Sequence, residues 1–326
     1  MIITVSRAAD LGQVRKALAG IGLWVSPPER REDGEALLVV QSSSTQVDVE
    51  QIRAVQGVVS ISRPDSTHPR VDAQGPVAQI GKNSIGREAP VLIAGPCSVE
   101  SREQILRIAT TLRERGVLYL RGGAFKPRSS PYAFQGKGSE ALGWLRDAAD
   151  ACGQAVITEV LSEHDVAAVA EHADVLQIGS RNMHNYALLK SVGKTARPVL
   201  LKRSMSATVE EWLLAGEYLL SSGAGSVMFC ERGVRTFDES TRNLLDLGAV
   251  ALLSHVHKLP VIVDPSHATG RRDLIVPLAR AALAAGAAGV MIEVHDKPEQ
   301  AESDAPQALH PDALGPVLLA LRGGDA

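Results

Sequence analysis

One stretch decides the fold, Val91-Leu92-Ile93-Ala94-Gly95-Pro96-Cys97-Ser98, in which a short apolar run ends in a polar turn. A run this short, rich in branched residues and bounded by glycine and proline, is typical of a strand buried on both faces. From here on the chain alternates such runs with longer helical patterns, which predicts repeated β-α units around a parallel sheet. The eight runs are 91–94, 117–120, 155–158, 175–178, 198–201, 226–229, 260–263 and 289–292.

Eight parallel strands close naturally into a barrel, so we predict an α/β fold of the (β/α)8 TIM barrel type. The alternative, an open doubly wound sheet, would carry a glycine-rich dinucleotide fingerprint after its first strand, and Gly95-Pro96-Cys97 is not one. Capping boxes are predicted where Ser101 precedes Gln104 and where Thr208 precedes Glu211. Glycines predict three helix ends, at positions 116, 223 and 286.

Residues 1–63 predict a separate α+β ferredoxin-like (ACT-like) module. Its strands are expected at 2–5, 23–25, 37–40 and 58–61, with helices near 11–18 and 49–55 and a hairpin turn at Asp33-Gly34. Prolines and glycines in a polar context predict a linker at 64–76. Residues 77–326 are assigned to the barrel, with an extra hairpin expected at 77–86.

Composition excludes several classes of protein. The formal net charge of -3 gives no overall basic field for nucleic acid or an anionic membrane. The apolar runs are too short to span a bilayer, and the N-terminus has no secretory signal pattern, so we expect a cytoplasmic location. Three cysteines, Cys97, Cys152 and Cys230, are too few for a disulfide framework, and we assign the last two to packing.

Polar side chains follow the first, seventh and eighth runs, where a barrel places its active site. Cys97 follows the first run, His267 the seventh and Glu293 the eighth, and Asp304 lies in the loop beyond. Each alone has a plain structural alternative: a buried thiol, a histidine at the barrel mouth, a helix cap or an ion pair. Together they offer soft and hard ligands, which suit one divalent ion such as Mn, Fe, Co or Zn.

Cationic side chains follow the second, fourth, fifth and sixth runs. They are Arg121, Lys126, Arg128, Arg181, Lys202, Arg203 and Arg232, with Ser180 and the glycines Gly122 and Gly123 as further donors. Cations crowded at one mouth repel each other and lose hydration, so they predict an anionic guest that carries phosphate and carboxylate groups. For any one of them, the alternative is a solvent-exposed surface residue with no role in binding.

These motifs together resemble a known family. The quoted segments are Gly95-Pro96-Cys97-Ser98, Leu120-Arg121-Gly122-Gly123-Ala124-Phe125-Lys126-Pro127-Arg128-Ser129-Ser130-Pro131-Tyr132, Gln177-Ile178-Gly179-Ser180-Arg181-Asn182-Met183, Leu201-Lys202-Arg203, Cys230-Glu231-Arg232-Gly233, Asp264-Pro265-Ser266-His267 and Glu293-Val294-His295. They are similar to the type I 3-deoxy-D-arabino-heptulosonate 7-phosphate (DAHP) synthases, in the branch related to 3-deoxy-D-manno-octulosonate 8-phosphate synthase. The resemblance runs from about 91 to 309, and Ser204 departs from it, since a glycine is usual there.

The resemblance implies a reaction and a set of site residues. Phosphoenolpyruvate and erythrose 4-phosphate would condense with water to DAHP and phosphate, the first step of the shikimate pathway. The implied sets are metal on Cys97, His267, Glu293 and Asp304; phosphoenolpyruvate on Arg121, Lys126, Ser180, Arg181, Lys202 and Arg232; and erythrose 4-phosphate on Lys126, Pro127, Arg128 and Ser129. The octulosonate synthases, which use arabinose 5-phosphate, usually have Lys-Ala-Asn where this chain has Lys126-Pro127-Arg128, so they remain the alternative.

The expected catalytic residues are Lys126, Cys97 and His267. We expect the metal to act as a Lewis acid on the aldehyde, and crowding by Arg121, Arg128 and the metal to lower the pKa of Lys126, which then protonates the new alkoxide. The resemblance also implies a homotetramer, and feedback inhibition by an aromatic amino acid bound to the N-terminal module. A non-catalytic ligand sensor is the alternative from another class.

Overall fold

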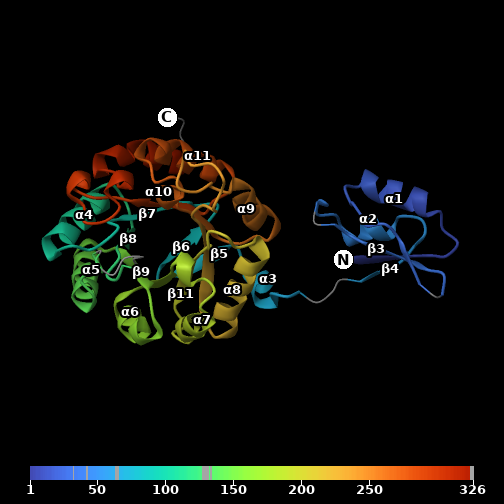
Figure 1. Ribbon diagram of the computed structural model, residues 1–326, viewed down its shortest axis with the longest axis horizontal. Coiled ribbons are helices and arrows are strands. Elements are labelled where there is room, and N and C mark those ends of the chain that lie inside the picture. The colour runs from blue at the N-terminus through green and yellow to red at the C-terminus, as the bar shows by residue number, and fades with distance from the viewer. Residues whose placement is uncertain (32, 42, 63–65, 127–131, 133, 324–326) are drawn as a thin grey trace. The chain divides into compact units, whose positions relative to one another are not determined.

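The computed structural model describes residues 1–31, 33–41, 43–62, 66–126, 132 and 134–323. The chain divides into two compact units, the N-terminal unit Met1–Thr67 and the barrel unit His68–Ala326 (Figure 1). Each has its own hydrophobic core, and they are described separately.

Eight parallel strands of the barrel unit form a closed barrel in the order β10-β11-β12-β13-β14-β7-β8-β9. Every predicted run contributes one strand. The strands are β7 (Val91–Gly95), β8 (Tyr119–Arg121), β9 (Ala155–Val160), β10 (Val175–Ile178), β11 (Pro198–Lys202), β12 (Ser226–Glu231), β13 (Val261–Val263) and β14 (Gly289–Glu293). The TIM barrel prediction is confirmed.

Helices surround the strands (Figure 1). They are α4 (Arg102–Glu114), α5 (Ser139–Cys152), α6 (Val166–His172), α7 (Tyr186–Gly193), α8 (Val209–Ser221), α9 (Leu247–Ala251), α10 (Pro265–Thr269), α11 (Ile275–Ala284) and α12 (Gly315–Leu321). Short 3-10 turns lie at Glu163–Asp165, Ser180–Asn182, Arg272–Leu274, Pro298–Gln300, Ala305–Gln307 and Pro311–Leu314, and a π-helical turn at Leu252–Val256.

The predicted helix caps are largely present. Thr208 and Glu211 form a complete capping box at the start of α8. At α4 only half of the box forms, because Ser101 accepts from the backbone N–H of Gln104 while the Gln104 side chain accepts from that of Glu100. The three predicted terminal glycines all have positive φ.

The barrel is filled by side chains and closed at its amino end by a hairpin. Strands β5 (Val77–Ile80) and β6 (Asn83–Gly86) pair antiparallel over the expected range. Ala78, Ile80 and Ile85 join the cluster that fills the barrel, which includes Cys230. The amino end is therefore packed, and the carboxyl ends of the strands are left for function.

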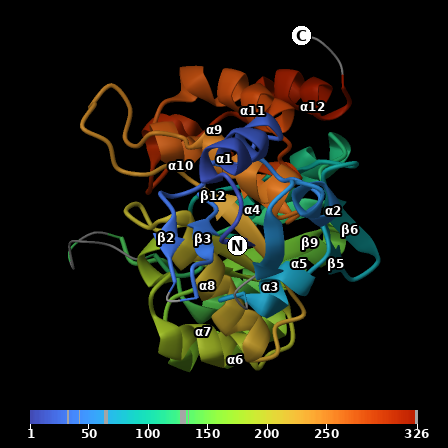
Figure 2. The ribbon, with the colours of Figure 1, turned by 90° about the vertical axis from the view of Figure 1, so that its right-hand side faces the viewer.

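The predicted linker 64–76 is too long, because it contains a helix that belongs to the barrel unit. Helix α3 (Pro69–Ala73) lies beside α8 in both ribbon views (Figures 1 and 2). Val71 is fully buried, and its backbone N–H donates to the Glu217 carboxylate of α8 at 3.0 Å. The sequence did not predict this helix, because the segment is polar and rich in proline and a single apolar residue, Val71, packs against the barrel unit.

The N-terminal unit has the predicted β-α-β-β-α-β order. Its elements are β1 (Ile2–Val5), α1 (Leu11–Gly20), β2 (Glu29–Arg30), β3 (Ala36–Val39), α2 (Val49–Arg53) and β4 (Val58–Ser62), with the antiparallel sheet order β2-β3-β1-β4. The strand expected at 23–25 is wrong: Val25 makes a single bridge to Val40, and the strand lies at Glu29–Arg30. Pro27 and Pro28 have no backbone N–H to donate, which interrupts the ladder between them.

Candidate active site

Acidic and thiol side chains meet at the carboxyl ends of β7 and β14. Cys97, Glu293 and Asp304 each present a ligand atom, and the three atoms lie within 4.8 Å of one another. Cys97 Sγ is 3.0 Å from Asp304 Oδ2. Strand register explains part of this, because Glu293 on β14 pairs with Gly95 on β7, just before the turn that carries Cys97. This group could hold a metal ion.

The fourth predicted ligand, His267, borders this group through one of its members. It lies in α10, where its Nε2 is 3.3 Å from Glu293 Oε1 and its Nδ1 is 2.7 Å from Asp264 Oδ2. Among the described residues, three predicted ligands thus form a tight cluster, and the imidazole adjoins it. A thiol, two carboxylates and an imidazole suit a borderline divalent cation.

The electrostatics of the cluster fit a bound cation. Burial, followed by the charge of Glu293, raises the pKa of Cys97 to about 12. Burial would also raise the pKa of Glu293, but His267, Arg121 and Lys126 lower it to about 2. A thiol held neutral by burial beside the ionised carboxylate of Glu293 becomes a ligand when a cation displaces its proton.

Lys126 connects this cluster with the rest of the mouth. Its Nζ lies 2.9 Å from Cys97 Sγ and donates to the Cys97 carbonyl oxygen at 3.0 Å. Among the described residues, the pKa of Lys126 is raised rather than lowered. Burial lowers it, but the interactions with Cys97 and Glu293 outweigh burial and Arg121. The ammonium therefore stays protonated at neutral pH.

A cavity of about 460 Å³ opens beside Lys126. Its described lining residues are Lys126, Glu159, Gly179, Ser180, Arg181, Lys202, Met205, Arg232, Arg235, Arg242, Asn243, His267 and Asp304. The residues expected to bind phosphoenolpyruvate therefore converge, with one exception. Arg121 is not among the described lining residues, because its Nη1 is bound to Glu293 at 2.9 Å and to the Pro96 carbonyl oxygen.

Two buried guanidinium nitrogens near the cavity have no hydrogen-bond partner among the described residues. Arg232 is 7% exposed, and its Nη1 has no hydrogen-bond partner among the residues that the structure describes. Burial is the main reason why the pKa of Arg232 is lowered. Within the same described part of the chain, Arg121 Nε is unpartnered too. Buried donors left unpaired destabilise the protein, and an anionic guest would satisfy them.

A larger cavity, of about 1190 Å³, lies elsewhere, at the amino ends of β7 and β8 and beside α11 and α12. Apolar side chains such as Leu92, Val117 and Leu321 dominate its lining. The chemistry expected of the fold lies at the opposite ends of the strands, so we assign the active site to the smaller cavity.

The sequence matches the profile of the DAHP synthetase I family over residues 60–322. The chain belongs to the DAHP synthetase I family. The family predicted from the motifs is thereby confirmed.

Relatives of this family member support the assignment. A Thermotoga maritima protein named phospho-2-dehydro-3-deoxyheptonate aldolase is 49% identical over 261 residues, which cover 80% of this chain and 77% of the relative. A crystal structure of that enzyme, also called DAHP synthase, superposes with a TM-score of 0.77 at 39% identity, covering 99% of this chain and 96% of the other. A truncated form from the same organism gives a TM-score of 0.71 at 45% identity, covering 77% and 92%.

Family members of the alternative branch are more distant. A 2-dehydro-3-deoxyphosphooctonate aldolase from Methylobacterium radiotolerans is 31% identical over 257 residues, which cover 73% of this chain and 90% of the relative.

The described part of the chain contains no helix long and apolar enough to cross a membrane.

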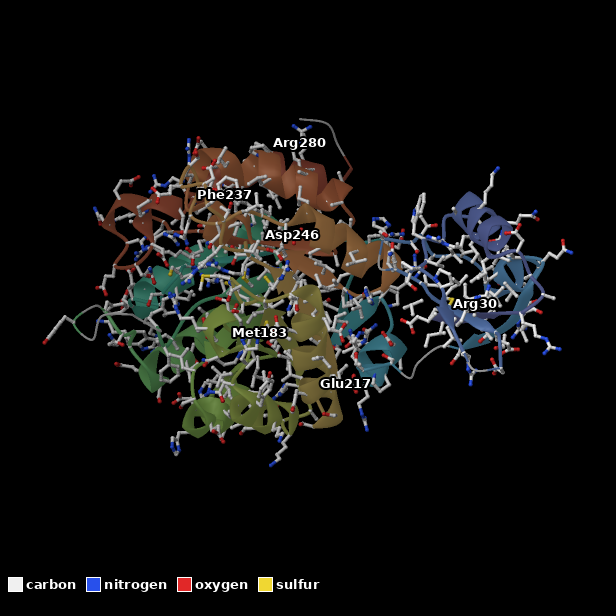
Figure 3. All side chains as sticks on the ribbon, turned by 45° about the vertical axis from the view of Figure 1, so that its right-hand side comes forward. Arg30, Met183, Glu217, Phe237, Asp246 and Arg280 are labelled. Carbon is white, nitrogen blue, oxygen red and sulfur yellow. The ribbon has the colours of Figure 1, made fainter. Side chains whose placement is uncertain are left out.

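Some residues singled out from the sequence lie away from the cavity or outside the described part of this family member. Arg203 does not line the cavity: its guanidinium binds Glu231 and Asp246, each at 2.9 Å. Ser204, the departure from the family pattern, is half-buried and donates its backbone N–H to Met183 Sδ at 3.2 Å (Figure 3 labels Met183). Pro127, Arg128 and Ser129, expected on erythrose 4-phosphate, lie outside the described residues.

Sequence reasoning missed several residues of the mouth. Glu159 on β9 faces the cavity, and a Cβ added to Gly179 would lie 1.9 Å from its Oε1, so a larger residue there would have to displace this carboxylate. Arg235 and Arg242 add two further cations. Glu159 could have been found, because it directly follows the run 155–158, whereas Arg242 lies far from any strand end.

Proposed function

We propose that this chain condenses phosphoenolpyruvate with erythrose 4-phosphate and water to give DAHP and inorganic phosphate, at the carboxyl end of its barrel. One observation carries the proposal: Lys126 belongs both to the acid and thiol cluster and to the wall of the cation-lined cavity. A substrate anion in that cavity would thus lie next to a site for a divalent cation.

The metal would be held by Cys97, Glu293 and Asp304, with His267 as a fourth ligand; Mn, Fe, Co and Zn are the candidates. When bound, it supplies a Lewis acid for the aldehyde oxygen of the second substrate. The donor set supports this assignment, because thiolate and imidazole accompany the two carboxylates and so favour a borderline ion over Mg²⁺ or Ca²⁺.

Phosphoenolpyruvate would occupy the cavity. We assign its phosphate to Arg181 and Arg232, because the buried Arg232 has an unpartnered Nη1. Lys202 and Lys126 are assigned to the carboxylate side, with Ser180 as a neutral donor. Arg121, although paired with Glu293, keeps its Nε for the substrate. Bidentate and charge-assisted contacts of this kind fix orientation as well as offset charge.

The reaction then forms a C–C bond and a C–O bond and breaks one C–O bond. C3 of phosphoenolpyruvate bonds to the aldehyde carbon, water adds at C2, and the C2–O bond to the phosphate breaks. One proton of the water leaves with the phosphate, and the other replaces the proton given to the new alkoxide. Lys126, protonated because its pKa is raised, is placed to donate a proton to the new alkoxide. The segment 126–129 would bind the phosphate of erythrose 4-phosphate.

A direct assay tests the reaction. Phosphate release from phosphoenolpyruvate is followed with erythrose 4-phosphate, with arabinose 5-phosphate and with neither aldose. We expect release with erythrose 4-phosphate only, lost after exhaustive chelation and restored by a divalent ion. Faster release with arabinose 5-phosphate would favour the octulosonate alternative, and full activity after chelation would remove the metal from the proposal.

The N-terminal unit is assigned a regulatory role, with an aromatic amino acid as effector and a homotetramer as the assembly. Its separate core supports the idea that it folds by itself. Deleting residues 1–67 should leave activity but remove inhibition by tyrosine or phenylalanine, and light scattering of the full chain should give four subunits. Inhibition that survives deletion would move the effector site to the barrel unit.

A further inference from the structure

One buried carboxylate lies between the metal side and the phosphoenolpyruvate side of the mouth. Asp264 follows β13 and is 0% exposed. Its Oδ2 accepts from Lys202 Nζ at 2.6 Å and from His267 Nδ1 at 2.7 Å. Its Oδ1 accepts the backbone N–H of His267 at 3.0 Å, which caps α10. Asp264 thus contacts both groups, although β12 separates the strand of Lys202 from its own.

The contact decides which nitrogen of His267 faces the cluster. An ionised carboxylate only accepts hydrogen bonds, so the imidazole carries its proton on Nδ1. When a cation occupies the cluster, the ring that binds it must be neutral, and its lone pair is then on Nε2, the atom that lies 3.3 Å from Glu293 Oε1. A carboxylate that orients a histidine in this way commonly tunes metal affinity.

The same oxygen restrains Lys202. The lysine is buried, and this hydrogen bond holds its ammonium at the cavity wall. With one oxygen shared between two donors, a change at Asp264 must disturb both.

We propose that Asp264 is a positioning residue that couples the two subsites, holding His267 for the metal and Lys202 for phosphoenolpyruvate through a single oxygen. The proposal rests on the proposed function for the identity of the two ligands. It predicts that one substitution at Asp264 weakens both metal binding and phosphoenolpyruvate binding, although Asp264 itself is proposed to contact neither ligand.

The chain offers a matched control in Asp246 (labelled in Figure 3). Asp246 accepts a hydrogen bond from the backbone N–H of Ala249 and so caps α9. It also binds Arg203, the residue after Lys202 at the end of β11, at 2.9 Å. It therefore repeats the cap and the ion pair of Asp264. Its hydrogen bonds among the described residues go to Arg203 and Ala249 rather than to His267, and it is not among the described residues that line the cavity.

The variants are Asp264→Asn and Asp246→Asn in the full chain. An asparagine keeps the volume but turns one oxygen into an amide donor, which then meets the N–H groups of Lys202 or His267. Zinc affinity of chelator-treated protein is measured by competition with a metallochromic chelator. Phosphoenolpyruvate affinity is measured by calorimetry on the metal-free protein, so neither readout needs turnover.

We expect Asp264→Asn to weaken zinc binding about 10–100-fold, and metal-free phosphoenolpyruvate binding about tenfold or more. Asp246→Asn should change neither by more than about twofold, whatever its effect on thermal stability. Nitrogen-detected NMR of the His267 ring, assigned with His267→Gln, should show the Nδ1–H tautomer in the parent and a shift toward Nε2–H in Asp264→Asn.

The proposal is overturned if Asp264→Asn changes only one affinity, or changes both no more than Asp246→Asn does. If Asp264→Asn does not fold, Asp264→Glu decides, because the added methylene displaces the carboxylate while keeping its charge, and both affinities are expected to fall as in Asp264→Asn. Failure of the proposed function itself looks different: the parent protein would then bind neither zinc nor phosphoenolpyruvate.

Discussion

Replacing Arg232 with methionine should make the protein more stable and a poorer binder of phosphoenolpyruvate. The Arg232 guanidinium is buried and leaves Nη1 unpartnered within the described part of the chain. A buried polar group without a partner costs about 1–3 kcal/mol. Removing it should stabilise the ligand-free protein by that amount, an increase in Tm of roughly 2–12 °C for a unit of this size.

Binding should change in the opposite sense. A hydrogen bond to a charged group contributes about 1.5–3 kcal/mol. Its loss should weaken phosphoenolpyruvate binding roughly 10–150-fold. The cavity leaves room for the methionine, so no packing strain is expected to offset the gain in stability.

The control is the same substitution one strand away, Arg203→Met. This arginine is fully paired, with Glu231 and Asp246. Its removal leaves the 0% exposed side chain of Glu231 without its counter-ion, which should lower stability by about 3–5 kcal/mol. Urea melts followed by tryptophan fluorescence and calorimetric titration measure both quantities. A lower Tm for Arg232→Met, together with unchanged phosphoenolpyruvate binding, would refute the reasoning.

Three further predictions concern other parts of the barrel unit. Gly179→Ala should lower kcat at least tenfold with little loss of helix content by circular dichroism, because the new Cβ displaces the Glu159 carboxylate within the mouth. Glu217→Ala should lower stability by about 1–2 kcal/mol in urea melts, since two backbone N–H groups of α3 lose their acceptor; an unchanged midpoint would contradict this. Burial and His68 lower the pKa of His257, so its contribution to stability is present above pH 6.5 and is lost as the pH falls; His257→Gln should flatten the decline of Tm between pH 7 and 5.5, and a parallel decline would count against it.

The strands were predictable because each is buried on both faces, so that a short apolar run is its complete signature. The helix α3 was not, since a single side chain, Val71, anchors it. The strand at Glu29–Arg30 was missed for a similar reason: both of its side chains are exposed, and no apolar pattern marks them.

The site was predictable where a side chain lies at or just beyond the carboxyl end of a strand. Cys97 and Lys202 were found in this way, but Arg203 was assigned to the site by the same reasoning and does not belong to it. Successive residues at a strand end point to opposite sides, so Lys202 faces the barrel mouth while Arg203 turns to Glu231 and Trp212. The shared contact of Asp264 depends on the distance between two strands that are not neighbours, which no local pattern records.

The central claim, that thiol and carboxylates at these strand ends form one metal site, can be tested by titrating the chelator-treated protein with Co²⁺ and recording its absorption. A thiolate ligand gives a sulfur-to-metal charge-transfer band in the near ultraviolet. We predict that the band forms in the parent and in Cys152→Ser, and is absent in Cys97→Ser. A band that persists in Cys97→Ser, or that disappears in Cys152→Ser, would contradict the account.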